Sequence, residues 1–415
     1  MRVVQINVAC QYGSTGVIVV EIAEYLKQHG HEVYIAYGQG MTDYPDSYRI
    51  GTPLENRLHG ILNTRIWGEE GTGTIRGTKR FIDWLNQIKP DIIHIHNLHS
   101  NYLNYKLFFP YLAKKKIPVV WTFMDCWPFT GKCSHFTEIK CEKWKKECHH
   151  CPQLRSSGPI SWFFDKTQKL YHEKQQWFKM LQYLDIIAIS EWQKEEVLKS
   201  MACHHPVHMI YLWIDTKKFY EIHDKYVYKR YGLSPQKKIL LSVSAQWSNQ
   251  TTRLNDAIRL AKILPEDYQL VIVGKKTTKQ ILPVNLIHID YIAGSEELSK
   301  LYSCALAYVN FSVEDTFGKV MAESQLCGTP AIVFDSTACS EVAGDAGYAV
   351  PPHDVEAMLE RVLEIEHNGR EYYSQRCIEH VKKNFDYNVN VGKYLEIYQH
   401  ALIRKQTKTA HNTQL

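Results

Sequence analysis

Continuous apolar runs alternate with amphipathic segments along the first half of the chain. The apolar runs predict buried strands at 3–8, 31–37, 92–96, 117–123 and 185–189. Apolar residues spaced three or four positions apart predict helices at 17–30, 78–88, 103–115 and 191–200. Strands that are apolar on both faces and alternate with helices form parallel sheets that helices cover on both sides. The first half of the chain therefore predicts a doubly wound α/β domain.

The same alternation restarts after a stretch at 213–221, which we interpret as a linker. The second half predicts strands at 239–244, 268–273, 286–289, 305–311 and 331–334, and helices at 254–264, 296–302 and 320–327. Helical patterns then continue to about residue 403. We therefore expect an N-terminal domain at 1–212, a C-terminal domain at 213–403 and a disordered polar tail at 404–415.

Length, composition and charge narrow the class of protein. A chain of 415 residues is longer than one hydrophobic core usually supports, and 45% hydrophobic with 22% charged residues argues against disorder. The formal charge of +5 suits an anionic ligand or lipid headgroups but does not indicate a nucleic-acid-binding protein. The first residues predict a buried strand, not a signal peptide, and no apolar stretch is long enough to span a bilayer. We expect a cytoplasmic protein. If it contacts a membrane peripherally, we expect the contact at the inner face.

Two acidic residues lie on either side of a predicted helix start in the second half. Asp315 follows the apolar run at 305–311, and Glu323 lies eight positions later, about one turn inside the helix that Gly318 opens. The first backbone N–H groups of a helix have no partner within it and bind anions, most naturally a diphosphate. Both carboxylates can then face one ligand, and a carboxylate at 323 can accept both hydroxyl protons of a ribose.

The segment at 312–330 resembles the donor-site signature of the retaining glycosyltransferases of family four, in which an acid and a glutamate enclose Phe-Gly. The resemblance implies that Glu323 holds the nucleotide ribose. It also implies that Asp315, or Glu314 beside it, holds the hydroxyls of the donor sugar and takes part in catalysis. Phe317 lies inside the motif. The backbone N–H groups that would reach the diphosphate belong to Gly318, Lys319 and Val320.

The resemblance extends from the loop at Gly13 to the helix after Pro330 and implies the GT-B fold, with two facing Rossmann-like domains and an interdomain cleft. It implies transfer of a hexosyl unit, with retention, from a nucleotide-diphosphate sugar to a glycan or polyprenyl-linked acceptor. It implies that donor binding and catalysis need no metal or other cofactor. The subgroup that the chain resembles makes capsule or exopolysaccharide, as the segments at 96–99 and 125–133 indicate together.

Two further features are expected to bind the donor. Gly13 and Gly16 join the first strand to the first helix, where glycine lets the backbone approach a phosphate or sugar closely. Family members carry an arginine and a lysine just after the first strand of the second domain, but this chain has neither at that place. Arg253 is the cation within reach and is our candidate phosphate ligand, with the lysines at 275 and 276 as a second choice.

The acceptor side is expected at the ends of two strands in the first half. Asn97 and His99 follow the strand at 92–96 and are candidate acceptor-binding residues, whereas His94 suits a packed core position as well as a functional one. The histidines at 94, 96 and 99 also suit a metal site. Asp125 ends the next strand and matches a catalytic segment in which the family usually has His-Asp. Met124 occupies the histidine position, so the role of that imidazole must be absent or supplied by another residue.

Four cysteines lie within nineteen residues of the insertion at about 126–155: Cys133, Cys141, Cys148 and Cys151. In a cytoplasmic protein such a cluster indicates a structural zinc site, with free, packed cysteines as the alternative. The run at 143–146 combines basic and aromatic residues and has two interpretations. The simpler one is an ordinary solvated surface, and the alternative is a contact with anionic lipid headgroups.

Two other functions remain open at this point. One is a non-catalytic protein that binds nucleotide sugars or glycans, which Met124 and the missing basic pair favour. The other is a nucleotide-sugar epimerase of the same fold, which fits the order of the motifs less well. Neither nucleotide, sugar, acceptor nor oligomeric state follows from the sequence.

Overall fold

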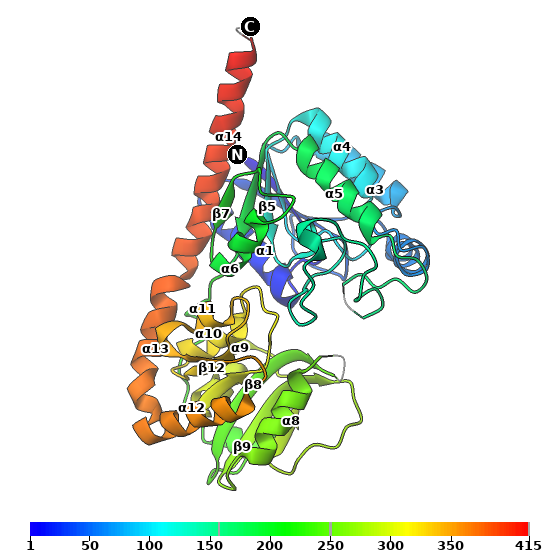
Figure 1. Ribbon diagram of the computed structural model, residues 1–415. Helices are drawn as coiled ribbons and strands as arrows, with labels where there is room; N and C mark the ends of the chain where they lie inside the picture. Colours follow the sequence, from blue (N-terminus) through cyan, green and yellow to red (C-terminus); the bar gives the residue numbers. More distant parts are fainter. Residues whose placement is uncertain (157, 249–250, 414–415) are drawn as a thin grey trace. The chain divides into compact units, whose positions relative to one another are not determined.

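The computed structural model describes residues 1–156, 158–248 and 251–413, which form two compact units. The N-terminal unit contains Met1–Ile210 together with Val391–Leu415, and the C-terminal unit contains Tyr211–Asn390. Each unit has one parallel sheet covered by helices, as the alternating pattern predicts (Figure 1). No helix in the described part of the chain combines the length and apolar character that crossing a bilayer requires.

The N-terminal sheet has the strand order β3-β2-β1-β4-β5-β6-β7. Its strands are β1 Arg2–Asn7, β2 Glu32–Tyr37, β3 Ser47–Arg49, β4 Ile92–Ile95, β5 Val119–Phe123, β6 Leu184–Ala188 and β7 Val207–Met209. Its helices are α1 Gly13–Gln28, α2 Pro53–Leu58, the π-helix η1 His59–Ile66, α3 Ile75–Ile88, α4 Tyr105–Lys115, the 3₁₀ turns η2 Trp127–Phe129 and η3 Lys143–Lys145, α5 Thr167–Met180 and α6 Glu191–Leu198. The order reverses between β1 and β4, so the loops after these two strands diverge at the carboxyl edge, where such sheets bind ligands.

Both faces of the N-terminal sheet are buried, which explains why its strands are apolar throughout. On one face, α3, α4 and α5 lie side by side and cover a core rich in aromatic residues (Figure 1). On the other face, His94 of β4 donates or accepts hydrogen bonds at Thr122 Oγ1 (2.8 Å) and at the Tyr398 hydroxyl (2.6 Å). His94 is therefore a packed core histidine. His96 is also buried, and its Nε2 bonds to Gln5 Oε1 at 2.9 Å.

The C-terminal sheet has the strand order β10-β9-β8-β11-β12-β13. Its strands are β8 Lys238–Trp247, β9 Tyr268–Lys276, β10 Leu286–Ile289, β11 Ala307–Asn310, β12 Ala331–Phe334 and β13 Tyr348–Val350. Its helices are α7 Tyr226–Tyr231, α8 Arg253–Ile263, α9 Ser295–Cys304, α10 Lys319–Leu326, α11 Cys339–Ala343, the 3₁₀ turn η4 Gly344–Ala346, α12 Val355–Asn368 and α13 Arg370–Asn384. Here the order reverses between β8 and β11, so the loops after these strands diverge at the carboxyl edge as in the first sheet.

The last helix, α14 Tyr387–Thr413, differs from the predicted domain limits. We predicted that the C-terminal domain would continue to 403 and that a disordered tail would follow, but the chain returns to the N-terminal unit at Val391. Tyr394 and Tyr398 are fully buried there, and Arg404 donates to the nearly buried Asp185 at 3.0 Å. The apolar face of α14 and this ion pair keep the helix formed beyond residue 404, where the polar composition alone suggested fraying.

Candidate active site

The loop between β11 and α10 forms the candidate donor site of the C-terminal unit. Gly318, at the N-cap of α10, has a left-handed backbone (φ 84°), and a Cβ there would lie 2.1 Å from Met321 Cε. Only glycine fits this turn. No side chain caps α10 and its first turn holds no acid, so the N–H groups at its start remain available to an anion.

Asp315 is held firmly beside that helix start. Its carboxylate accepts a hydrogen bond from Asn310 Nδ2 at 3.2 Å, and its backbone N–H donates to Thr337 Oγ1 at 3.1 Å. Thr337 itself has a left-handed backbone (φ 53°), which is a strained conformation for a β-branched residue. Glu314 donates its backbone N–H to Ser312 Oγ at 3.2 Å.

Glu323 lies one turn inside α10 and is partly buried. Burial raises the pKa of its carboxyl group, and the nearby Lys319 ammonium opposes this shift. The Tyr302 hydroxyl donates to Glu323 Oε2 at 3.4 Å. A partly buried carboxylate with one protein donor retains lone pairs for the hydroxyl groups of a ligand.

Arg253 and Phe317 complete this site in different ways. Arg253 opens α8 and donates from Nη2 to Ser312 Oγ at 2.7 Å and from Nη1 to Ser244 Oγ at 3.3 Å. The guanidinium therefore lies against the same loop as Asp315. Phe317 is buried, and its ring centroid lies 5.1 Å from that of Phe385, so it anchors the loop in the core instead of facing a ligand.

The predicted Gly-rich loop opens the candidate site of the N-terminal unit. Gly13 starts α1 with φ 67°, and Gly16 accepts the Gln11 N–H at 3.1 Å through its carbonyl oxygen. Asn7, at the end of β1, donates to the Ala9 carbonyl oxygen at 2.8 Å. Its Oδ1 accepts the backbone N–H of Asn97 at 3.3 Å. Asn7 thus joins the Gly-rich loop to the acceptor-side loop after β4.

His99 and Asp125 form the central pair of the acceptor side. His99 Nε2 lies 2.8 Å from Asp125 Oδ2, and the two side chains are 20% and 12% exposed. Burial lowers the pKa of His99, but the charge and hydrogen bond of Asp125 outweigh it and leave that pKa raised. Burial raises the pKa of Asp125, yet His99 leaves it lowered overall. The Trp127 N–H also donates to Asp125 Oδ1 at 2.9 Å.

Met124 occupies the position where the family usually has a histidine, and its side chain is buried. The imidazole beside Asp125 at this edge of the sheet comes from His99 instead. His99 Nδ1 lies 3.3 Å from the hydroxyl of Ser100. Ser100 and Asn101 both have left-handed backbones (φ 94° and 65°), a strain that often accompanies functional loops.

Two buried charged residues that our sequence analysis did not identify support this loop. Glu70 accepts Trp127 Nε1–H at 2.9 Å and the Ser100 N–H at 3.4 Å, and burial raises its pKa. Lys174 donates to the carbonyl oxygens of Trp127 and Thr130 and lies 3.5 Å above the Trp127 ring centroid. Burial lowers the Lys174 pKa to about 7. In the sequence both residues stand among other polar residues, so no pattern marks them as buried.

The cysteine-rich insertion brings two of its four cysteines into contact. Cys133 Sγ lies 3.8 Å from Cys151 Sγ, and the Gly131 N–H donates to Cys148 Sγ at 3.2 Å. Two thiolates bound to one tetrahedral zinc at about 2.3 Å are separated by about 3.8 Å, so this pair suits such an ion. Within the described residues, however, no group of three or more His, Cys, Asp or Glu side chains is arranged to hold a metal. The zinc site stays a prediction.

The basic run at 143–146 does not present its aromatic residue to solvent. Trp144 is buried, and its ring centroid lies 4.7 Å from that of Phe136. Lys143 donates to the carbonyl oxygens of His149 (3.1 Å) and His150 (3.0 Å), so this lysine holds the insertion together.

Comparison with known proteins identifies both halves of the chain. The model for "Glycosyltransferase Family 4" matches residues 15–218, and the model for "Glycosyl transferases group 1" matches residues 228–384. A putative colanic acid biosynthesis glycosyl transferase, WcaC of Escherichia coli, is 28% identical over 206 residues, which are 46% of this chain and 49% of that protein. The chain thus matches about half the length of this relative.

Two other matches extend over more of the chain. The O-antigen chain mannosyltransferase RfbU of Salmonella typhimurium is 23% identical over 74% of this chain and 90% of its own length. Among solved structures, HepE of Anabaena in complex with UDP and glucose has a TM-score of 0.65 at 11% identity, covering 96% of this chain and all of HepE (100%). This likeness shows that the fold is GT-B.

Proposed function

Because the chain belongs to glycosyltransferase family 4, we propose that it moves a hexosyl unit from a nucleotide-diphosphate sugar to a growing glycan or lipid-linked acceptor. The observation that supports this most is the uncapped start of α10, with Asp315 on one side and Glu323 on the other. The WcaC, RfbU and HepE matches support a nucleotide-sugar donor and an acceptor in surface polysaccharide assembly.

In the proposed donor complex, each group of the C-terminal unit binds a different part of the nucleotide sugar. The N–H groups of Gly318, Lys319 and Val320 bind the diphosphate, and Arg253 adds a bidentate cation. Glu323 accepts the ribose hydroxyl protons. These groups stabilise the negative charge that develops on the departing nucleoside diphosphate. The donor sugar's own hydroxyls are held by Asp315, with Glu314 as the alternative.

In the proposed transfer step, His99 receives the proton of the acceptor hydroxyl. The acceptor oxygen bonds to the anomeric carbon on the face from which the diphosphate leaves with the bonding electron pair, so the configuration is retained. Asp125 accepts the N–H of the imidazole Nε2, so Nδ1, which lies beside the Ser100 hydroxyl, is the nitrogen that takes the proton. Asp125 is then a positioning residue, and Asn97 contributes acceptor contacts from the same loop.

Calorimetry with a panel of nucleoside diphosphates tests the donor site. Glu323→Gln keeps the size of the side chain but removes its charge, and we expect donor affinity to fall by at least about tenfold. Glu341→Gln, an acid of the neighbouring helix α11, is the matched control and should leave affinity unchanged. Equal affinities for wild-type protein and Glu323→Gln would contradict the proposal.

Product analysis separates the proposed function from its alternatives. A transferase releases nucleoside diphosphate only when an acceptor is present. Release of an epimerised nucleotide sugar without acceptor would indicate an epimerase, and binding with no turnover under any condition would indicate a binding protein.

A further inference from the structure

A group of large apolar side chains in the N-terminal unit faces solvent instead of a core. We call it the aromatic surface, and it consists of Leu58, Leu62, Trp67, Trp162, Phe163 and Phe164. Trp67 is 54% exposed and Phe163 is 66% exposed. Scattered apolar residues are normal on a protein surface, but a contiguous group of aromatic rings indicates a partner.

Two distant chain segments build the aromatic surface, and specific contacts hold them together. The Trp162 N–H donates to the Arg65 carbonyl oxygen at 2.7 Å, and the rings of Trp67 and Phe164 stack at 5.3 Å with an interplanar angle of 9°. Gly68 has φ 69°, and a Cβ there would lie 2.3 Å from the Phe164 carbonyl oxygen. The close approach of the segments therefore requires glycine at 68. The rings are ordered in place before any partner arrives.

Two cations border the aromatic surface. The Arg65 guanidinium lies 5.8 Å from the Trp162 ring centroid, and Lys166 Nζ lies 5.9 Å from that of Phe164. The neighbouring acids are engaged with the protein itself: Glu69 forms an ion pair with Lys169, and Asp165 accepts the Thr167 hydroxyl at 2.6 Å. Aromatic rings bordered by Arg and Lys are the combination that settles at the boundary between lipid headgroups and acyl chains.

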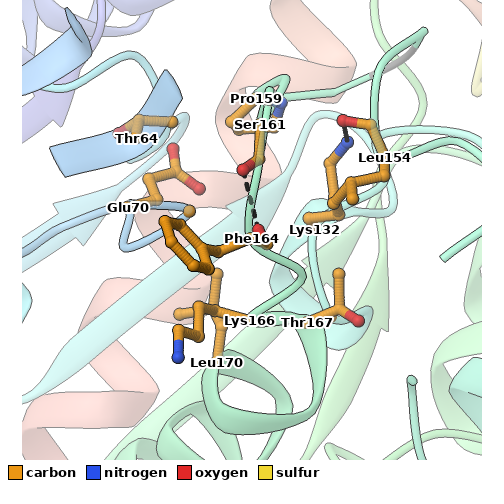
Figure 2. Close-up of a pocket in the computed structure, with 12 residues that line it drawn as sticks. Thr64, Glu70, Lys132, Leu154, Pro159, Ser161, Phe164, Lys166, Thr167 and Leu170 are labelled. Atoms are coloured by element: carbon orange, nitrogen blue, oxygen red, sulfur yellow. Dashed lines mark hydrogen bonds between the residues drawn. The ribbon is translucent and has the colours of Figure 1, made fainter. Parts of the chain in front are cut away.

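A pocket behind the aromatic surface connects it to the acceptor side. Its lining includes Phe164, Lys166, Lys132 and Glu70. Figure 2 shows Phe164 near Glu70 on one side and Lys132, which donates to the Leu154 carbonyl oxygen, on the other. Glu70 also accepts the Ser100 N–H of the loop that carries His99. The aromatic surface is thus continuous with the residues to which we assign the acceptor.

We propose that the aromatic surface docks the N-terminal unit onto an anionic lipid bilayer, with the rings in the headgroup boundary and Arg65 and Lys166 against the phosphates. The inference deepens the proposed function and rests on it, because a lipid-linked acceptor would reach His99 from that membrane. Partial insertion of a few rings needs no membrane-spanning helix. A soluble glycan is the less favoured partner, since stacked sugars also need polar side chains pointing outward among the rings.

Cosedimentation of the full-length protein with lipid vesicles tests the proposal. We expect binding to phosphatidylcholine vesicles that contain phosphatidylglycerol, weaker binding to phosphatidylcholine alone, and weakening by salt. Trp162→Ser/Phe163→Ser should lower binding by about tenfold or more. The matched control is Ile281→Ser/Val284→Ser, which removes two apolar side chains that are 91% and 97% exposed in the C-terminal unit and should bind as wild type.

A charge series sharpens the test. Arg65→Gln/Lys166→Gln should reduce binding to anionic vesicles, whereas Lys114→Gln/Lys115→Gln, in the last turn of α4, should not. Equal binding by the Trp162/Phe163 variant and its control would overturn the proposal, as would wild-type protein that stays in solution with anionic vesicles. Calorimetry that shows a soluble oligosaccharide bound at Trp162 and Phe163 would also overturn it.

Measuring donor binding alongside vesicle binding distinguishes a failure of the membrane proposal from a failure of the proposed function. Glu323→Gln should still cosediment with vesicles, and the aromatic variant should still bind nucleoside diphosphate in solution. Because the donor site lies in the other unit, a circular dichroism spectrum and a melting temperature equal to those of wild type are the evidence that the aromatic variant folds.

Discussion

The proposed donor side and the proposed acceptor side of this protein are built in opposite ways. The candidate donor residues Asp315, Gly318 and Glu323 lie in one strand–loop–helix segment, where short-range geometry brings them together. The acceptor cluster joins side chains from segments far apart in the chain, because Glu70, His99 and Lys174 meet only around Trp127. A local site can be identified from spacing, whereas a dispersed one depends on the whole fold.

The largest effect that distinguishes the two sides is expected at His99. His99→Gln removes the proton acceptor and should lower kcat/KM by about 10²- to 10⁴-fold, while donor affinity stays at the wild-type value. Steady-state kinetics and calorimetry on the same preparation measure both. A variant that loses donor affinity in parallel would show that the two sides are not separable.

The pH profile tests the pairing of His99 with Asp125. A proton acceptor must be neutral, and Asp125 raises the His99 pKa, so wild-type activity should fall as pH drops through a value above the ordinary 6.5 of histidine. Asp125→Asn removes the carboxylate that favours the imidazolium form and should move this acid limb to lower pH, with a lower rate at every pH. An unmoved acid limb would assign the titration to another group.

On the donor side, Arg253→Met should weaken nucleoside-diphosphate binding by about 10- to 100-fold, because it removes a charge-assisted bidentate contact. Lys275→Met is the comparison, since Lys275 was our second choice and is exposed. Calorimetry ranks the two. A larger loss at Lys275 would move the phosphate contact to the end of β9.

A smaller effect, on stability instead of chemistry, is expected at Lys174. Because the folded-state pKa of Lys174 is lowered to about 7 from 10.5, the unfolded chain binds more protons between these values, and stability should rise with pH across that window. Lys174→Met should flatten this rise and cost about 1–3 kcal/mol, since two buried carbonyl oxygens lose their donor. Urea unfolding at several pH values measures both, with the exposed Lys179→Met as control.

The smallest effect on activity is expected from the cysteine insertion. If Cys133, Cys141, Cys148 and Cys151 hold zinc, elemental analysis should find one zinc per chain, and chelation should lower the melting temperature without changing donor affinity. Cys203→Ser, outside the insertion, should retain the metal. Protein purified without added metal that contains no zinc would remove this prediction.

The fold followed from the alternating pattern because buried parallel strands are apolar on both faces and their helices are amphipathic. The pattern did not show the π-helix η1 or the short edge strand β3, whose residues are only partly buried. At the donor site, the sequence indicated the carboxylates and the helix start. It missed Asn310 and Thr337, which orient Asp315 from five and twenty-two residues away, because such side-chain hydrogen bonds leave no periodic signal.

The acceptor side shows the same limit more strongly. Asn97, His99 and Asp125 were identifiable because each follows an apolar strand. Because Met124 occupies the usual histidine position, the sequence did not show which residue provides an imidazole there. The contact between His99 and Asp125 points to His99. Glu70 and Lys174 each follow another charged residue in the sequence, and burial alone distinguishes them from surface residues.

The path of α14 has a practical consequence for anyone who wishes to study the first half of the chain alone. The polypeptide leaves the N-terminal unit at Ile210 and comes back at Val391, so a gene cut once after residue 210 would omit Tyr398, the hydroxyl partner of His94, and Arg404, the partner of Asp185. A faithful half-molecule must splice 391–415 onto 210 through a short artificial bridge, or supply that helix as a separate peptide.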